Sequence, residues 1–268
     1  MENYSEKNRE AWNEAAGIHK KNRKINYCEQ FKDKNFSTLD DTLSSLLKKI
    51  PLNGKNIAQL CCNNGRELLS IVNTAGATGV GFDISDEFIA EAIGIVKSAN
   101  LNCQFVRTDI NHLTDKYNNN FDLVLFTAGA LTWFYDLEKL FQLVGRLLKS
   151  EGYLVIYEIH PFTNLLAMKD EPFYDPKNPY KIVYNYFRND PWIKNTGADY
   201  IGKTTYKSKT FTSFAHKISD IITAIGSNEF AIKEFIEYPH DVSAGFENLE
   251  KNQMVPLSYT IIGRKPKY

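Results

Sequence analysis

The sequence predicts an α/β fold, with a largely parallel sheet and helices on both of its faces. Between residues 56 and 157, five short apolar segments alternate with amphipathic segments of helical periodicity. Strands that are apolar along their whole length are typical of a parallel sheet covered on both faces. Two further apolar segments near the C-terminus bring the number of predicted strands to seven.

Composition limits the classes of function. The chain has 268 residues, 43% hydrophobic and 24% charged, as in ordinary globular proteins. Its 32 basic and 32 acidic side chains cancel, which makes nucleic acid an unlikely partner, because phosphate binding favours a basic excess. Residues 1–24 are polar and lack the apolar stretch of a signal peptide or membrane span, so we expect a cytoplasmic protein without a membrane partner.

Cysteines and histidines indicate neither a disulfide framework nor a metal site. The adjacent Cys61 and Cys62 are poorly placed for a disulfide, and we interpret all four cysteines as reduced thiols. Cys61 and Cys62 fit small buried residues better than nucleophiles. The five histidines lack the spacing of metal ligands, so no metal is expected.

Two helices are predicted before the first strand. Residues 5–19 form a polar helix with Ser5 as a candidate N-cap, and residues 37–50 form an amphipathic helix capped by Ser37. We expect residues 1–36 to be a helical lid segment, with Trp12 and Tyr27 among the lid residues.

The core elements follow in a regular order, joined by right-handed crossovers. Strands are predicted at 56–61, 78–82, 103–107, 121–126 and 153–157, and helices at 66–75, 86–99 and 136–148. A helix over 212–225 and strands over 230–237 and 257–264 complete the core, which comprises residues 37–160 and 212–268.

Residues 161–211 are predicted to be a folded insertion that forms part of a ligand pocket. Residues 171–214 hold four of the nine prolines and eleven aromatic residues, far too many for a disordered linker. Alternating residues at 183–187 and at 204–206 predict short antiparallel strands there.

The evidence for function lies at the ends of three consecutive predicted strands. In an open parallel sheet, ligands bind beyond the carboxyl ends of the strands, where the winding direction reverses. There the sequence places the turn 61–65, whose asparagines and Gly65 tolerate positive φ, and then Asp83 and Asp109. Asp83 is placed to accept both hydroxyls of a ribose, and Asp109 to accept from the amino group of adenine.

This ordered set resembles the motifs of the class I S-adenosylmethionine-dependent methyltransferases, and most closely those of the small-molecule type. Residues 60–65 resemble the glycine-rich first motif, residues 79–85 resemble the second motif with its ribose-binding acid, and residues 108–110 resemble the adenine-binding third motif. Residues 121–124 are similar to the family's fourth strand, and residues 147–154 are similar to its turn into the fifth strand. The resemblance implies a Rossmann-like seven-stranded, mostly parallel sheet with an antiparallel terminal strand. The cofactor-binding residues that it implies are Gln59, Leu60, Cys61, Cys62, Asn63, Gly65, Asp83, Ile84, Asp109, Ile110 and Thr127.

The first motif departs from the family pattern at three positions. The family usually has an acid where Gln59 stands, and glycines where Cys61 and Asn63 stand. Gln59 still offers a carbonyl oxygen to the cofactor's ammonium group, and asparagine is the best non-glycine residue for left-handed backbone.

The resemblance implies methyl transfer from S-adenosylmethionine to an acceptor. Residues 127–130 read Thr-Ala-Gly-Ala and lack the motif of enzymes that methylate amide or exocyclic amino nitrogens, which favours a small or medium organic acceptor. Candidate general bases are Glu158 and His160 after the fifth strand, and His240 at the end of the sixth. Each could instead be structural, just as Asp83 could cap a helix and Asp109 could belong to a turn.

Three other functions remain open. A nicotinamide dehydrogenase would carry GxGxxG, which the stretch 61–66 lacks. A non-catalytic S-adenosylmethionine-binding or regulatory protein would fit the weakened first motif. An RNA methyltransferase is disfavoured by the neutral net charge.

Overall fold

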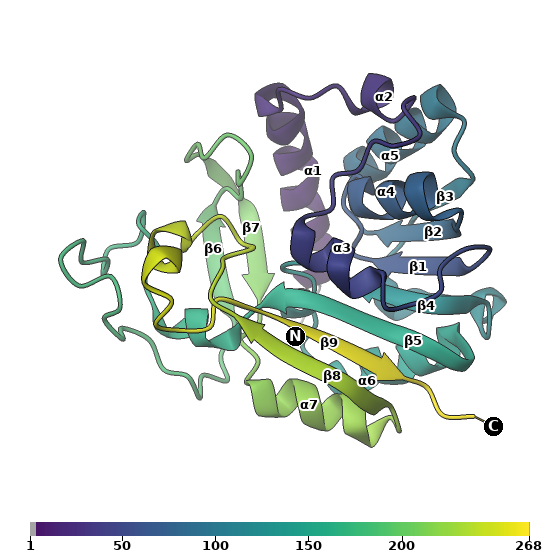
Figure 1. Ribbon diagram of the computed structural model, residues 1–268. Helices are drawn as coiled ribbons and strands as arrows, with labels where there is room; N and C mark the ends of the chain where they lie inside the picture. The colour runs from purple at the N-terminus through teal and green to yellow at the C-terminus, as the bar shows by residue number, and fades with distance from the viewer. Residues whose placement is uncertain (1–3, 268) are drawn as a thin grey trace.

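The computed structural model describes residues 4–267, and its centre is one seven-stranded sheet. The strand order is β3-β2-β1-β4-β5-β9-β8 (Figure 1). Strands β1 to β5 are parallel, and β9 runs antiparallel to both of its neighbours, β5 and β8. The bounds are β1 Asn56–Leu60, β2 Thr78–Asp83, β3 Cys103–Arg107, β4 Phe121–Phe126, β5 Leu148–Ile159, β8 Ala231–Tyr238 and β9 Ser258–Arg264. All seven predicted strands and the antiparallel terminal strand are therefore confirmed.

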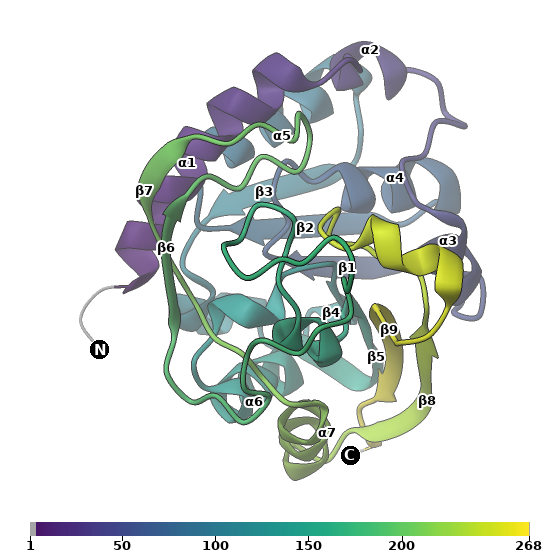
Figure 2. The same ribbon diagram turned by 90° about the vertical axis from the view of Figure 1, so that its left-hand side faces the viewer.

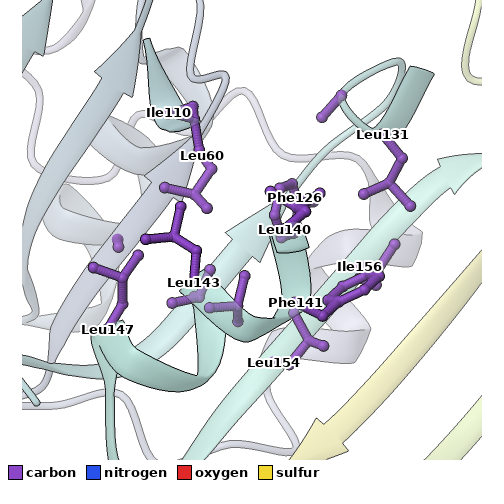
Figure 3. Close-up of a cluster of buried hydrophobic side chains, with 14 of the residues drawn as sticks. Leu60, Ile110, Phe126, Leu131, Leu140, Phe141, Leu143, Leu147, Leu154 and Ile156 are labelled. Carbon is purple, nitrogen blue, oxygen red and sulfur yellow. The ribbon is translucent and has the colours of Figure 1, made fainter. Parts of the chain in front are cut away.

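Helices cover both faces of this sheet. Helices α3 Asp41–Leu47, α4 Arg66–Ala75 and α5 Asp86–Ala99 cover one face, and α6 Leu137–Leu147 and α7 Ile218–Ser227 cover the other (Figure 1). Figure 3 shows the core on the second face, where Leu140, Leu143 and Leu147 of α6 pack with Phe126 and Ile156 of the sheet. Five buried side chains of this size remove several hundred square ångströms of apolar surface from water, which holds α6 against the sheet.

The small residue Gly81 sets the spacing between β2 and its surroundings. A Cβ atom at Gly81 would lie 2.4 Å from Phe105 Cε1 and 2.9 Å from Cys62 Sγ, closer than real contacts allow. Phe105 of β3 therefore lies over the glycine and against the turn that follows β1. The absence of a side chain at Gly81 lets residues 61–65, the turn after β1 that we call the first turn, pack closely against β2.

The N-terminal segment crosses the carboxyl ends of the strands. Helix α1 Tyr4–Asn22 runs beside α5 and the insertion, and α2 Tyr27–Gln30 follows it (Figure 2). Ser5 lies inside α1 and is not its N-cap. Ser37 is not the cap of α3 either, because its hydroxyl accepts from Leu39 N, and Asp40 caps the helix by accepting from Leu43 N at 2.7 Å.

The insertion is folded, but its strands lie elsewhere than predicted. A two-stranded antiparallel sheet joins β6 Trp192–Thr196 to β7 Lys207–Ser213, so the predicted strands at 183–187 and 204–206 are wrong. The predicted start of a helix at residue 212 is also wrong, since α7 begins at Ile218. The reason is a distant partner: the Asn8 side chain of α1 donates to Thr212 O at 2.8 Å and accepts from Thr212 N at 2.7 Å, which holds this segment extended.

Short 3-10 helices lie in the loops between these elements. They are η1 Ile110–His112, η2 Asp115–Tyr117, η3 Leu131–Trp133, η4 Pro161–Leu165 and η5 Glu247–Asn252. The last of these occupies the long connection between β8 and β9.

Candidate functional site

A cavity of about 550 Å³ lies at the carboxyl ends of β1, β2, β3 and β4. The strand order reverses here, because β2 and β3 lie on one side of β1 and β4 and β5 lie on the other. Its volume is within the range of small-molecule sites. The first turn, the ends of the strands, helix α1, the start of α3, and residues 200–201 and 241–244 all contribute to its wall.

The structure brings most of the predicted cofactor residues together on this wall. Eight of them line the cavity, namely Cys61, Cys62, Asn63, Asp83, Ile84, Asp109, Ile110 and Thr127. Three others, Gln59, Leu60 and Gly65, lie behind it and do not line it. Residues that are distant in sequence are thus gathered into one place by the parallel sheet.

The first turn has left-handed backbone at the two positions where the family has glycine. The φ angles are 55° at Cys61 and 53° at Asn63, and 74° at Gly65. Left-handed backbone at a non-glycine residue costs about 1–2 kcal/mol, so two such residues in one turn place appreciable strain at this site. Gly65 must also lack a Cβ atom, which would lie 2.2 Å from the Phe105 ring.

Gln59 is fully buried, and both ends of its side-chain amide bond to the protein. Its Oε1 accepts from Leu68 N at 3.2 Å, and its Nε2 donates to Thr127 Oγ1 at 3.1 Å. The side chain therefore fixes the first turn of α4 to the end of β4. This places Gln59 one layer behind the cavity.

Asp83 lies at the end of β2 and is 8% exposed. Its Oδ2 accepts from Asn63 N at 2.7 Å and its Oδ1 from Ser85 N at 2.9 Å. Burial raises the pKa of this carboxyl, and the hydrogen bonds from Ser85 and Asn63 oppose the rise. Because each carboxylate oxygen can accept more than one hydrogen bond, the side chain retains capacity for two further hydroxyl donors, as a ribose requires.

Asp109 lines the cavity at the end of β3. Its Oδ1 accepts from Asn111 N at 2.9 Å and from Asn111 Nδ2 at 3.1 Å, so it caps η1. The capping role that the sequence left open is therefore present. It engages Oδ1, and Oδ2 is 3.7 Å from His112 Nδ1, beyond hydrogen-bond distance.

Glu158 is buried behind the loop after β4, of which Gly129 and Ala130 line the cavity. Its Oε2 accepts from Gly129 N at 2.7 Å, and its Oε1 accepts from Leu131 N at 2.8 Å. Burial raises the pKa of Glu158 to about 7 against the opposing effect of these bonds. The carboxyl does not itself line the cavity, and its geometry is that of a group which shapes the loop after β4.

His160 also lies outside the cavity lining. Its Nδ1 accepts from Phe162 N at 3.0 Å, so the proton is on Nε2, which lies 2.8 Å from Glu237 Oε1. Burial lowers the pKa of His160. These contacts cap η4 and join it to β8.

His240 stands one hydrogen bond away from the cavity. Its Nε2 lies 2.8 Å from the Tyr157 hydroxyl, which donates to Asp40 Oδ2 at 2.9 Å. Tyr157 and Asp40 line the cavity, whereas His240 does not. The sequence did not identify Tyr157 or Asp40 as site residues, because Tyr157 lies inside an apolar strand and Asp40 lies inside a predicted helix. The only signal was that Tyr157 is near the end of the fifth strand.

Helix α1 and the insertion close the other side of the cavity. The Trp12 ring centroid lies 5.3 Å from that of Trp133 and 5.1 Å from that of Phe211. Of the two residues expected in the lid, Trp12 lines the cavity, whereas Tyr27 does not and packs against Phe31. Trp133 comes from η3 and Phe211 from β7, so aromatic rings from three segments that are distant in the sequence meet here.

Residues 197–204 form a strap that lies over the first turn. His19 Nε2 lies 2.6 Å from Ala198 O, and Asn22 Nδ2 donates to Asp199 Oδ2 at 2.8 Å, which ties the strap to α1. At its centre, the Tyr200 hydroxyl accepts from Asn63 Nδ2 at 3.0 Å. Tyr200 and Ile201 are the residues of the strap that line the cavity.

The structure also bears on metals, thiols and membranes. Within residues 4–267, no three His, Cys, Asp or Glu side chains gather in a way that could hold a metal ion. All four cysteines are free thiols. None of the helices in the described part of the chain is long and apolar enough to span a membrane.

The chain matches a known family and many solved structures. Residues 52–197, more than half of the chain, match the model of a family described as a methyltransferase domain. A search of curated proteins finds no match. An S-adenosylmethionine-dependent methyltransferase from Mesorhizobium loti is similar with a TM-score of 0.61 and 19% identity, over 84% of this chain and 96% of that one.

Two further structures share the fold. A methyltransferase of the same cofactor dependence from Clostridium acetobutylicum has a TM-score of 0.59 and 16% identity, over 95% of this chain and 99% of that one. A geranyl diphosphate C-methyltransferase from Streptomyces coelicolor, solved with S-adenosylhomocysteine, has a TM-score of 0.55 and 11% identity, over 85% and 76%. With the family match and the gathered motifs, the chain belongs to the class I S-adenosylmethionine-dependent methyltransferases, and S-adenosylmethionine is its cofactor.

Proposed function

We propose that the enzyme transfers the methyl group of S-adenosylmethionine to a small or medium organic acceptor inside the 550 Å³ cavity. The observation that carries this proposal is the composition of the cavity wall. One side holds the cofactor motifs, and the other is closed by α1, the strap and the aromatic rings of Trp12 and Trp133. An acceptor enclosed in this way must be small enough to enter the same cavity.

The cofactor-binding part of the proposal assigns a role to each strand end. Asp83 accepts hydrogen bonds from the ribose hydroxyls, and Asp109 accepts one from the adenine amino group. Ile84 and Ile110 provide apolar surface beside the base. Cys61, Cys62 and Asn63 bring the backbone of the first turn close to the cofactor. Thr127, at the end of β4, also faces it. Gln59, Leu60 and Gly65 support this surface from behind. When bound, the cofactor supplies an activated methyl group on a sulfonium centre.

Orientation is the main contribution that the protein makes to the rate. Holding two reactants in line can lower the barrier by about 7–11 kcal/mol relative to reaction in solution. Trp133 and Phe134 of the loop after β4 line the cavity, and Glu158 fixes that loop through Gly129 and Leu131. We therefore assign Glu158 as a positioning residue for the acceptor wall.

An acceptor that loses a proton needs a polar group on the wall to receive it. Asp40 and Tyr157 are placed there, and His240 holds the Tyr157 hydroxyl from behind. We assign His240 as a positioning residue for Tyr157. His160, bonded to Glu237 and to η4, supports the loop after β5.

Composition supports the proposed acceptor class and compartment. The zero net charge argues against RNA as the acceptor, and no feature of the site favours a non-catalytic cofactor-binding role. Four free thiols suit the reducing cytoplasm, where we place the reaction.

Transfer of a labelled methyl group tests the proposal. Methyl-labelled S-adenosylmethionine and the enzyme are added separately to small-molecule, protein and RNA fractions of a cell extract. Label is expected in the small-molecule fraction, and it should disappear with the Asp83→Ala variant. Label found only in protein or only in RNA would refute the proposed acceptor class.

Fluorescence tests the enclosure of the cavity. Trp12 and Trp133 line the cavity, whereas Trp192 lies in β6 and does not. S-adenosylhomocysteine should change the emission of the wild type and of Trp192→Phe, and the change should shrink in Trp12→Phe. An emission that S-adenosylhomocysteine leaves unchanged would count against a closed cavity next to the cofactor.

A further inference from the structure

The charged side chains on the cavity wall are mostly acidic. Within residues 4–267, two guanidinium groups and five carboxylates line the cavity, and no lysine does. Both guanidinium groups are already paired. Arg23 pairs with Glu91, and the Nε of Arg66 lies 2.7 Å from a carboxylate oxygen of its neighbour in sequence. The carboxylates of the wall that remain are Asp40, Asp83, Asp109 and Asp241. This negative excess favours positively charged ligands over carboxylates and phosphates.

The cofactor and the protein itself account for three of these four carboxylates. Two of them are assigned above to the ribose and the adenine. Asp241 is held within its own loop, because its Oδ1 accepts from Ser243 N at 2.8 Å and its Oδ2 accepts from Phe246 N at 2.7 Å. Among the described residues, Asp40 is therefore the carboxylate of the wall that is left for a second ligand.

Asp40 has a fixed orientation and a free acceptor site. The residue is exposed, and its Oδ1 caps α3 by accepting from Leu43 N at 2.7 Å. Its Oδ2 accepts from the Tyr157 hydroxyl at 2.9 Å and can accept one more hydrogen bond. Burial and the charge of Asp40 raise the pKa of Tyr157, so that this hydroxyl stays protonated and continues to donate. His240 Nε2, 2.8 Å from the same hydroxyl, holds the tyrosine in place.

We propose that the methyl acceptor is a primary or secondary amine, which binds as its ammonium ion to Asp40 and gives a proton to it. This inference rests on the proposed function, because it names the acceptor class of the same cavity. An ammonium ion has no free lone pair and must lose a proton before it can attack. Oδ2 of Asp40 takes that proton and later releases it to solvent. The nitrogen lone pair then forms a bond to the methyl carbon and displaces S-adenosylhomocysteine, whose sulfur keeps the electron pair of the broken bond.

The charges of the reactants favour an amine over other acceptors. The sulfonium centre is positive, and it would repel an ammonium ion unless a nearby anion offset the repulsion, as the carboxylate of Asp40 does. A carboxylate or phosphate acceptor would be repelled by the acidic wall, and a neutral alcohol would gain nothing from it. A primary or secondary amine also keeps an N–H after losing one proton, so it can stay hydrogen-bonded to the wall during attack.

Selective acylation of amines tests the acceptor class. The small-molecule fraction of a cell extract is treated with an amine-selective acylating reagent, and the excess reagent is hydrolysed. The enzyme and methyl-labelled S-adenosylmethionine are then added. Acylation converts primary and secondary amines into amides, which are uncharged and poor nucleophiles. Label transfer seen in a mock-treated fraction should disappear in the treated one, and the addition of untreated extract should restore it.

Asp40→Asn tests the residue, and Asp41→Asn is the matched control. Asparagine is as good an N-cap as aspartate, so Asp40→Asn preserves α3 while it removes the charge and the base. Asp41 is also exposed but does not line the cavity. Label transfer to the untreated fraction should be about a hundredfold slower in Asp40→Asn, a typical contribution of a general base, and unchanged in Asp41→Asn. Both variants should bind S-adenosylhomocysteine as tightly as the wild type in calorimetry.

The possible outcomes separate this inference from the proposed function. Label that persists after acylation would refute the amine acceptor and leave the small-acceptor proposal intact. Equal transfer by the two variants would remove Asp40 from the reaction. Weaker binding of S-adenosylhomocysteine by Asp40→Asn would assign Asp40 to the cofactor and overturn its role toward the acceptor. Label that enters only protein or only RNA would refute the proposed function itself.

Discussion

The side-chain amide of Asn63 donates a hydrogen bond to the phenolic oxygen of Tyr200 at 3.0 Å, across 137 residues of sequence. Asn63 occupies a left-handed position, with φ of 53°, where the family has glycine. Its Oδ1 also accepts from Asn64 N at 2.7 Å, which orients the amide. The departure from glycine therefore supplies the group that ties the first turn to the strap.

Loss of this tie should speed release of the cofactor product. Tyr200→Phe removes one hydrogen bond of about 1 kcal/mol, so S-adenosylhomocysteine should dissociate about fivefold faster. Stopped-flow displacement measures the rate. Tyr153→Phe is the control, because Tyr153 lies in β5 under the Arg264 guanidinium and does not line this cavity, so its substitution should leave the rate unchanged. An unaltered dissociation rate in Tyr200→Phe would show that the strap does not hold the ligand in place.

Asp83 should be necessary for cofactor affinity. In Asp83→Asn an amide N–H₂ must face either Asn63 N or Ser85 N, both of which are donors. The mismatch and the lost acceptor should weaken binding of S-adenosylhomocysteine by about 1–3 kcal/mol, measured by calorimetry. Asp115→Asn, at an exposed position away from the cavity, should bind as the wild type does. Equal affinities of the two variants would contradict the assignment of Asp83.

Gly81 and Gly94 should respond in opposite directions to alanine. A Cβ atom at Gly81 meets Phe105 at 2.4 Å, so Gly81→Ala should lower the free energy of unfolding by about 1–3 kcal/mol. Phe105→Leu in the same chain should recover part of the loss. Gly94 lies inside α5, where an added methyl group would have no neighbour within 4 Å, so Gly94→Ala should add about 1 kcal/mol. Urea denaturation measures all three, and a stable Gly81→Ala protein would mean that β2 and β3 are less closely packed than described.

Stability should fall with rising pH because of Glu158. The pKa of Glu158 is raised from 4.5 to about 7 in the folded protein. Between these values the folded state holds a proton that the unfolded chain has released. The contribution of Glu158 to the free energy of unfolding therefore decreases as pH rises, and the decrease is complete above pH 7. The loss amounts to about 3 kcal/mol.

The comparison with Glu158→Gln isolates this effect. The other titrating groups contribute equally to both proteins, so the difference between their unfolding free energies should change by about 3 kcal/mol from pH 4.5 to pH 8. Denaturant titrations at several pH values measure it. A difference that stays constant with pH would show that Glu158 is ionised normally in the folded state.

The sheet could be predicted because its signals are local. Each strand is a short apolar segment that ends in a turn or polar residue, and the seven segments lie close to their observed bounds except at the start of β5, which begins five residues earlier than predicted. Asp83 and Asp109 could be placed at the cavity for the same reason. Each follows a parallel strand, and the carboxyl ends of all the parallel strands lie at the same edge of the sheet, where ligands bind.

The errors lie where a distant residue decides the local structure. Residues 212–213 read as the start of a helix, but the Asn8 side chain takes both backbone groups of Thr212 and keeps it extended. The error at Ser37 is local instead: the sequence offers two candidate caps three residues apart, and Asp40 is the one that accepts from Leu43 N. Tyr157 reads as a core residue, and only its contact with Asp40, 117 positions away, reveals the polar edge of the cavity.

The pairing of Asn8 with Thr212 also separates the order of synthesis from the order of assembly. Helix α1 leaves the ribosome before β7, which holds it and is complete only at residue 213. At about 5–20 residues per second, roughly 10–40 s pass before that strand exists. During this interval the face of α1 that carries Ala11 and Ala15, fully buried in the finished enzyme, has no strand to dock against and is open to chaperones. Helix α1 is thus made well before the strand that holds it.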